Sequence, residues 1–230
     1  MNLQGKTIVI IGGSQGFGKA LAQALIAEGS NVVIASKNEG RIHTAGEELG
    51  TISMVCDITN EESLQKLKDV VIEEFGSIDI WINSAGIFRV FPEDENLDIE
   101  KAREMFNINF FGSVLGTRTA INALKEKEGI IINILSSAAL DATRAVKAEL
   151  YASTKWALRG YIDAMRNEIK DTKIKLLSIF PGGMKTHLHD EKMPEEFGNF
   201  MDTSDVAQKV IQNLKLENPE KDLIIKRSQI

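Results

Sequence analysis

The sequence predicts an α/β fold, a doubly wound parallel sheet of the Rossmann type with about seven strands and helices on both faces. Two observations predict it. Short β-branched runs alternate with longer stretches of helical composition along the whole chain. The strand-like runs are apolar at nearly every position, which is typical of strands buried on both faces. With 230 residues, the chain is closest to one large domain, and we expect residues 1–230 to form it.

The individual elements follow this alternation in chain order. We predict strands at Thr7–Ile11, Asn31–Ala35, Ile52–Cys56, Ile78–Ile82, Gly129–Leu135, Ile174–Phe180 and Leu223–Lys226. We predict helices at Ala20–Ala27, Glu61–Phe75, Asp98–Leu124, Leu150–Lys170 and Ser204–Leu216. Glycines stop the first two of these helices, at Gly29 and Gly76, and Pro181-Gly182-Gly183 stops the sixth strand.

Composition excludes several classes of function. The 27 basic and 33 acidic residues give a net charge of −6, which argues against a nucleic-acid partner. The single cysteine, Cys56, excludes an internal disulfide and a zinc site built from several cysteines, and it fits a reducing compartment. No apolar run approaches the roughly 18 residues of a spanning helix, and Met1–Lys6 leads directly into the first strand. We therefore expect a cytoplasmic protein with no membrane partner.

A glycine-rich turn joins the first strand to the first helix. It reads Gly12-Gly13-Ser14-Gln15-Gly16-Phe17-Gly18, a Gly-x-x-x-Gly-x-Gly spacing that differs from the Gly-x-Gly-x-x-Gly fingerprint. Glycines permit a tight turn and close backbone approach to a pyrophosphate, which the positive end of the helix then faces. The turn predicts a dinucleotide site; the alternative is a purely structural turn.

The end of the second strand bears on which dinucleotide binds. An acidic residue there selects NAD by accepting from the ribose 2′-hydroxyl, whereas a basic residue favours the 2′-phosphate of NADP. This chain reads Ser36-Lys37-Asn38, with no carboxylate. We therefore predict a preference for NADP(H) over NAD(H); the alternative is that Lys37 is a solvated loop lysine.

Tyr151 and Lys155 lie four residues apart at the start of a predicted helix, so they share one face. A nearby cation favours the phenolate and lowers the tyrosine pKa from about 10. Such a tyrosine is a general acid for carbonyl reduction and a general base for alcohol oxidation. Taken alone, a tyrosine–lysine pair at this spacing is common on helices and is most often structural.

Together these motifs resemble the short-chain dehydrogenase/reductase family from about Lys6 to Thr186. The segments that carry the resemblance are the glycine turn, Cys56-Asp57-Ile58, Asn83-Ser84-Ala85-Gly86, Phe106–Gly112, Asn133–Ser137, Tyr151-x-x-x-Lys155 and Pro181–Thr186. No single segment is specific, but their common order and spacing are.

The resemblance implies four catalytic residues. Tyr151 would exchange a proton with the substrate oxygen, and Lys155 would hold the nicotinamide ribose and lower the pKa of Tyr151. Ser136 would steady the developing oxyanion, and Asn109 would anchor a water in a proton relay behind Lys155. Strand alignment selects Ser136, while counting back from Tyr151 leaves Ser137 as the alternative.

The resemblance also implies a set of cofactor contacts, in which Asp57 meets the adenine and Thr186 the nicotinamide amide. The expected contacts are Gly12, Ser14, Gln15, Gly16, Phe17, Gly18, Ser36, Lys37, Asn38, Asp57, Ile58, Asn83, Ala85, Gly86, Tyr151, Lys155, Pro181, Gly182, Met184 and Thr186. We expect no metal site, because His187 and His189 have no second pair of ligands at a fixed spacing.

The expected function is hydride transfer between NADP(H) and a small carbonyl compound or secondary alcohol. An enoyl reductase of the same fold would carry a Tyr-x6-Lys spacing in place of Tyr-x3-Lys, and a cofactor-sensing regulatory protein without turnover would lack the Tyr–Lys pair.

Residues 187–203 lie between a strand and a helix, where segments tend to cover a ligand. Apolar residues on two helices imply, through the resemblance, a homodimer or homotetramer; they are Phe106, Phe110, Phe111, Leu115, Trp156 and Met165.

Overall fold

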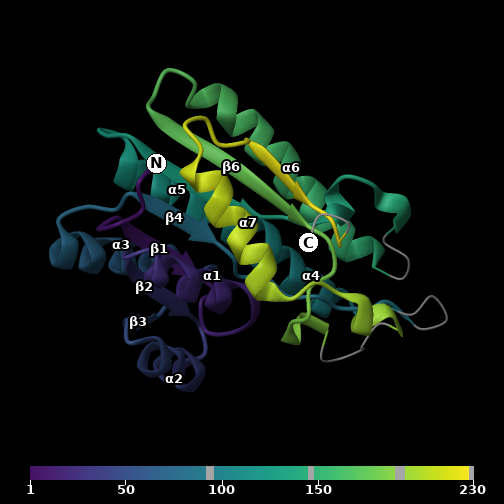
Figure 1. Cartoon of the computed structure of the whole chain (residues 1–230). Helices are drawn as coiled ribbons and strands as arrows, with labels where there is room; N and C mark the ends of the chain where they lie inside the picture. Colours follow the sequence, from purple (N-terminus) through teal and green to yellow (C-terminus); the bar gives the residue numbers. More distant parts are fainter. Residues whose placement is uncertain (92–95, 145–147, 190–194, 228–230) are drawn as a thin grey trace.

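The computed structural model describes residues 1–91, 96–144, 148–189 and 195–227, which form a sheet covered by helices (Figure 1). The strands are β1 (Thr7–Ile11), β2 (Asn31–Ser36), β3 (Ile52–Val55), β4 (Ile80–Asn83), β5 (Gly129–Ile134), β6 (Ile174–Pro181) and β7 (Asp222–Ile225). The helices are α1 (Gly16–Ala27), α2 (Glu39–Leu49), α3 (Glu61–Phe75), α4 (Ile99–Phe106), α5 (Ser113–Leu124), α6 (Glu149–Glu168) and α7 (Thr203–Lys215).

The seven strands form one parallel sheet in the order β3-β2-β1-β4-β5-β6-β7. This confirms the predicted doubly wound fold. The chain fills one side of the sheet with β2 and β3 and then returns to place β4 on the other side of β1. The helices on either side of this reversal cover opposite faces, so a crevice opens at the carboxyl ends of β1 and β4.

Strand burial explains why the strand sequences are apolar throughout. Every residue of β1, β4 and β5 is buried, because the central strands have helices on both faces. Side chains from alternate strand positions pack with α1, α2 and α7 on one face and with α3, α5 and α6 on the other. Figure 1 shows α1 and α7 lying along the same face of the sheet.

Three helices differ from the prediction. α2 is not among the predicted helices, because only Ile42, Ala45 and Gly46 of its residues are buried and its apolar period is weak. α1 begins at Gly16 rather than Ala20, because the glycines of its first turn hide its helical character. The predicted helix Asp98–Leu124 divides into α4, a π-helical segment over Asn107–Gly112, and α5. Such wide turns inside helices are frequent at functional sites, and this one contains Asn109.

Among the helices of the described ranges, none is both long and apolar enough to cross a membrane.

Candidate active site

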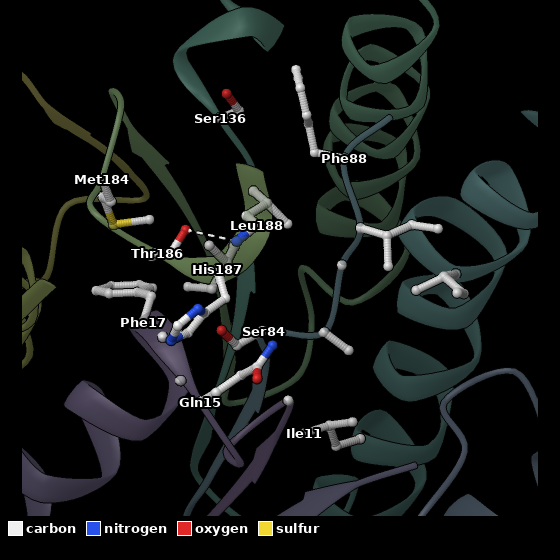
Figure 2. Close-up of a pocket in the computed structure, with 18 of the residues that line it drawn as sticks. Ile11, Gln15, Phe17, Ser84, Phe88, Ser136, Met184, Thr186, His187 and Leu188 are labelled. Atoms are coloured by element: carbon white, nitrogen blue, oxygen red, sulfur yellow. Dashed lines mark hydrogen bonds between the residues drawn. The ribbon is translucent and has the colours of Figure 1, made fainter. Parts of the chain in front are cut away.

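A cavity of about 850 Å³ lies at the carboxyl ends of the strands, within the size range of small-molecule sites. It extends from the turn between β1 and α1 to the start of α6, and Figure 2 shows part of its lining. The structure brings most of the predicted site residues together here: Gly12, Ser14, Gln15, Gly16, Phe17, Gly18, Ser36, Lys37, Asn38, Asp57, Ile58, Ala85, Gly86, Ser136, Tyr151, Lys155, Pro181, Gly182, Met184 and Thr186. Two predicted residues, Asn83 and Asn109, do not line it.

The glycine turn is packed too tightly for side chains at three of its positions, Gly12, Gly13 and Gly18. Gly12 has a φ of +88°, and a Cβ there would lie 2.5 Å from the backbone nitrogen of Ala85. A Cβ on Gly18 would overlap the carbonyl oxygen of Gly12. This close packing places the amino end of α1 against the cavity, and a helix amino end is suited to bind phosphate.

Polar and charged side chains surround the end of the cavity next to β2. The Ser14 hydroxyl donates to the Ser36 hydroxyl at 3.0 Å, and the Lys37 Nζ lies 2.9 Å from Asp57 Oδ2. The hydrogen bond to Asp57 raises the pKa of Lys37. Burial works against ionisation of Asp57, yet hydrogen bonds from Thr59 and Lys37 outweigh it and lower the pKa of Asp57 on balance.

Arg41, which is not among the predicted site residues, also lines this end of the cavity. It lies in the first turn of α2, where its backbone N–H donates to the side chain of Asn38 at 2.9 Å and so caps the helix. An arginine three residues after a helix-capping asparagine, just beyond β2, is the sequence signal that could have identified it.

The first turns of α6 carry Tyr151 and Lys155 into the inner end of the cavity. The Lys155 ammonium donates to the Ile134 carbonyl at 3.0 Å and lies 5.8 Å from the centroid of the Tyr151 ring. The edge of the Phe88 ring packs against Tyr151 with centroids 5.1 Å apart. Phe88 follows the Asn-Ser-Ala-Gly motif by two residues, and nothing in the sequence marks it as a site residue.

Burial controls the ionisation of this pair. It raises the pKa of Tyr151 to about 12, although a hydrogen bond with Ser136 acts in the opposite direction. It lowers the pKa of Lys155 to about 8. Removal of the phenol from water dominates, so the Tyr151 pKa is raised overall and the tyrosine is neutral at neutral pH. The expected lowering of this pKa by Lys155 stays a prediction.

Ser136 and Ser137 both line the cavity, but their surroundings differ. Ser136 lies two residues beyond the end of β5, and its Oγ accepts a hydrogen bond from the backbone N–H of Ala138 at 3.2 Å. The hydrogen bond that lowers the Tyr151 pKa comes from Ser136. Of the two serines, the geometry favours Ser136 as the partner of Tyr151.

Asn109 is fully buried behind the cavity. Its side-chain amide pairs with the backbone of Ile87, donating to the carbonyl and accepting from the N–H, each at 2.8 Å. A further bond runs from Nδ2 to Thr154 Oγ1 at 3.2 Å. Asn109 thus holds the loop after β4 against α6; its part in a water relay stays a prediction.

Asn83 does not line the cavity, and its predicted cofactor contact stays a prediction. Its Oδ1 accepts from the Trp81 indole at 2.9 Å, and its Nδ2 donates to Asn133 at 3.0 Å and to Thr117 at 3.2 Å. The side chain is turned away from the cavity because the interior between β4, β5 and α5 supplies these partners. The following residues, Ser84 and Ala85, line the cavity instead.

The segment predicted to cover the substrate, 187–203, lies partly within the described chain, since residues 190–194 fall outside it. His187, Leu188 and Phe200 line the cavity. The Leu188 N–H donates to Thr186 Oγ1 at 3.3 Å (Figure 2). Met201 lies near the carboxyl end of the segment, and its backbone N–H donates to the Gly183 carbonyl at 2.9 Å. Within the ranges that the structure describes, no group of three or more His, Cys, Asp or Glu residues is placed to hold a metal ion.

A Rossmann-type sheet with a tyrosine–lysine pair beside a glycine turn defines a dinucleotide-dependent oxidoreductase. The chain belongs to the short chain dehydrogenase family, whose family model matches residues 6–196. It is therefore an oxidoreductase of the class that acts on alcohol or carbonyl groups with a nicotinamide cofactor.

Individual proteins support this assignment. The L-fucose dehydrogenase of Bos taurus is 30% identical over 188 residues, which cover 81% of this chain and 69% of the relative. Two solved structures share the fold. One is an alcohol dehydrogenase from Thermococcus sibiricus complexed with 5-hydroxy-NADP, with a TM-score of 0.83, 24% identity and 96% of each chain covered. The other is a 3-ketoacyl-(acyl-carrier-protein) reductase from Brucella melitensis complexed with NADH, with a TM-score of 0.88, 23% identity and 97% of each chain covered.

Proposed function

We propose that the protein transfers hydride between NADP(H) and a carbonyl compound or secondary alcohol, with Tyr151 as the general acid and base. The observation that carries this proposal is the convergence of Tyr151, Ser136 and Lys155 at the inner end of a cavity whose other end is the glycine turn. A phenol that is half-buried, neutral and hydrogen-bonded to a serine is equipped to donate a proton to a reacting oxygen.

The residues present fit a nicotinamide dinucleotide. The amino end of α1 and the tightly packed glycine turn would hold the pyrophosphate, and Lys155 and Thr186 would hold the nicotinamide end. Gly86 supports this fit, because a Cβ there would lie only 3.3 Å from Asn109 Oδ1 and 3.7 Å from Lys155 Nζ. When bound, the nicotinamide supplies or accepts the hydride, and the protein supplies position and charge.

The protein's own residues then account for the proton. In the reductive direction, Ser136 and Tyr151 donate hydrogen bonds to the substrate oxygen, and Tyr151 passes its proton to that oxygen as negative charge develops there. The Lys155 ammonium is held near the ring by the Ile134 carbonyl, so it stabilises the phenolate that remains. In the oxidative direction, the same phenolate accepts the proton of the alcohol.

Turnover separates this proposal from a cofactor-sensing protein of the same fold. We expect loss of NADPH absorbance in the presence of a panel of ketones, aldehydes, quinones and 3-ketoacyl thioesters, faster than the loss of NADH absorbance. Binding of both cofactors without turnover of any panel member would favour the sensing function. The tyrosine–lysine–serine arrangement favours the enzyme.

The proposed preference for NADP(H) rests on Ser36, Lys37 and Arg41. Lys37 is 77% exposed in its ion pair with Asp57, and an exposed pair of this kind is worth about 0–1 kcal/mol. Lys37 can therefore leave Asp57 at little cost to reach a 2′-phosphate, with Arg41 lining the same end of the cavity.

Lys37→Ala is accordingly expected to weaken NADPH binding about tenfold, or about 1.4 kcal/mol, and NADH binding less than twofold. Fluorescence titration of both cofactors measures the effect. Lys66→Ala, an exposed lysine on α3, is the matched control and should change neither affinity. Equal losses for the two cofactors would contradict the assignment of Lys37 to the phosphate.

We propose further that the chain self-associates and that residues 187–203 cover the substrate. Phe111 is 55% exposed and Trp156 is 41% exposed, which leaves large apolar surface on neighbouring parts of the π-helical segment and α6. Phe110, Leu115 and Met165 are instead partly buried against the core. A cytoplasmic location, which we also propose, suits the buried free thiol of Cys56.

A further inference from the structure

Three residues of α6 follow one another at a spacing of four along one side of the helix: Tyr151, Lys155 and Arg159. The proposed function uses the first two. Arg159 also donates a hydrogen bond, from Nη1 to the carbonyl of Ala139 at 2.8 Å. It lies two turns from Tyr151 and does not line the cavity, so it has no direct access to substrate.

The carbonyls held by Lys155 and Arg159 flank Ser136 in the chain. Lys155 holds the Ile134 carbonyl on one side, and Arg159 holds the Ala139 carbonyl on the other. Between these two points the chain leaves β5 and makes a single turn of 3₁₀ helix over Ser137–Ala139. Helix α6 therefore fixes both ends of the short segment that carries the serine.

The turn transmits this restraint to Ser136 through two hydrogen bonds. The backbone N–H of Ala139 donates to the Ser136 carbonyl at 3.0 Å, and the N–H of Ala138 donates to Ser136 Oγ at 3.2 Å. Ala139 is completely buried. Because Oγ accepts from Ala138, its single O–H is available to donate to Tyr151 or, when substrate is bound, to the substrate oxygen.

The guanidinium of Arg159 is itself held in place. It lies over the rings of Trp156 and Phe180, with centroid distances of 5.3 and 5.7 Å, and its Nε lies 4.0 Å from Asp163 Oδ2. Phe180 is buried in β6, so the stacking surface is rigid. A planar group fixed on an aromatic ring loses less freedom when it donates a hydrogen bond.

We propose that Arg159 is a positioning residue that sets the Ser136 hydroxyl relative to Tyr151 by fixing the Ala139 carbonyl. This inference rests on the proposed function, since it concerns the serine of the same reaction. Without the arginine, the 3₁₀ turn loses its outer attachment to α6, and the Ser136 hydroxyl samples orientations that do not reach the substrate oxygen. Small displacements of a catalytic group have large effects on rate.

A double-mutant cycle tests whether Arg159 acts through Ser136. Arg159→Met keeps the apolar stem and removes the donor. It is expected to lower kcat for NADPH-dependent carbonyl reduction about tenfold, while KM for NADPH changes less than twofold. In a Ser136→Ala background, the same change should lower kcat less than twofold further, because the group that it positions is already gone. Arg159→Lys, which keeps a donor, should recover most of the rate.

The outcomes that would overturn the inference are distinct. If Arg159→Met lowers kcat by the same factor in the wild type and in Ser136→Ala, Arg159 does not act through Ser136. If kcat is unchanged in the wild type, Arg159 has no part in the reaction. Arg103→Met, at an exposed position of α4, is the matched control and should have no effect. If Arg159→Met does not fold, Arg159→Leu, which also lacks a donor, replaces it in the cycle and is judged by the same outcomes.

Tyr151→Phe separates this inference from the proposed function. If that variant keeps full turnover, the proposed chemistry fails, and the role of Arg159 fails with it. If Tyr151→Phe is inactive while Arg159→Met has wild-type kcat, only the role of Arg159 is lost.

Discussion

Tyr151→Phe is expected to lower kcat for carbonyl reduction by about 10²–10⁴-fold, the usual contribution of a general acid. The change removes the proton donor and little else. The ring remains to pack against Phe88, whose centroid lies 5.1 Å away, and the backbone of α6 is untouched. The Kd for NADPH should therefore stay within about twofold of the wild-type value.

The chain provides a matched control for this variant. Its two tyrosines are Tyr151 and Tyr161, both on α6. Tyr161 packs against Phe110 and does not line the cavity, so Tyr161→Phe should leave kcat unchanged. Steady-state kinetics and cofactor titration on the two variants give the comparison. Full turnover by Tyr151→Phe would exclude the proposed chemistry, and loss of cofactor affinity would assign the tyrosine to binding.

Lys155→Met is expected to separate activity from stability. It should lower kcat by about 10²-fold, because the charge that stabilises the Tyr151 phenolate is lost. At pH 7 it should nevertheless leave the fold no less stable. Burial lowers the pKa of the Lys155 ammonium from 10.5 to about 8, so keeping it charged in the folded state costs about 3 kcal/mol. The variant removes that cost but leaves the Ile134 carbonyl without its donor, a loss of about 1–3 kcal/mol.

The pH dependence gives the sharper measurement. Below pH 8, Lys155 is protonated in both the folded and the unfolded state, and the full cost of burying the charge is present. Between pH 8 and 10.5 the folded state releases its proton first, so the wild type becomes more stable with rising pH and the variant does not.

Urea unfolding of both proteins at pH 7 and pH 10 should show the wild type gaining about 2–3 kcal/mol relative to Lys155→Met over that interval. Lys66→Met, on the exposed face of α3, is the control and should track the wild type at both pH values. A constant difference between wild type and Lys155→Met from pH 7 to pH 10 would contradict the lowered pKa. In the reductive assay, the wild-type rate should likewise fall above pH 8, as Lys155 loses its charge.

Much of the site could be predicted because its parts are local in sequence. The glycine turn lies between an apolar strand and a helix, and Tyr151 and Lys155 are brought onto one helical face by a spacing of four residues. Parallel strands present their carboxyl ends at one edge of the sheet, so the residues that follow β1, β2, β3 and β4 had to gather there.

Other features depend on partners distant in the chain, and no local pattern reports them. Asn83 is the first residue of the Asn-Ser-Ala-Gly motif, yet hydrogen bonds with Trp81, Thr117 and Asn133 hold its side chain in the interior. The side-chain amide of Asn109 makes two hydrogen bonds with the backbone of Ile87.

By itself, the sequence determined the order of the strands along the chain, the doubly wound sheet that they form and most of the residues that line the cavity, because periodicity and turn chemistry act over a few residues. Tertiary structure alone decided the ionisation of Tyr151 and Lys155, the interior partners of Asn83, and the attachment of the serine turn to Arg159. Burial and hydrogen bonding set these properties, and both depend on which distant segments pack around a group.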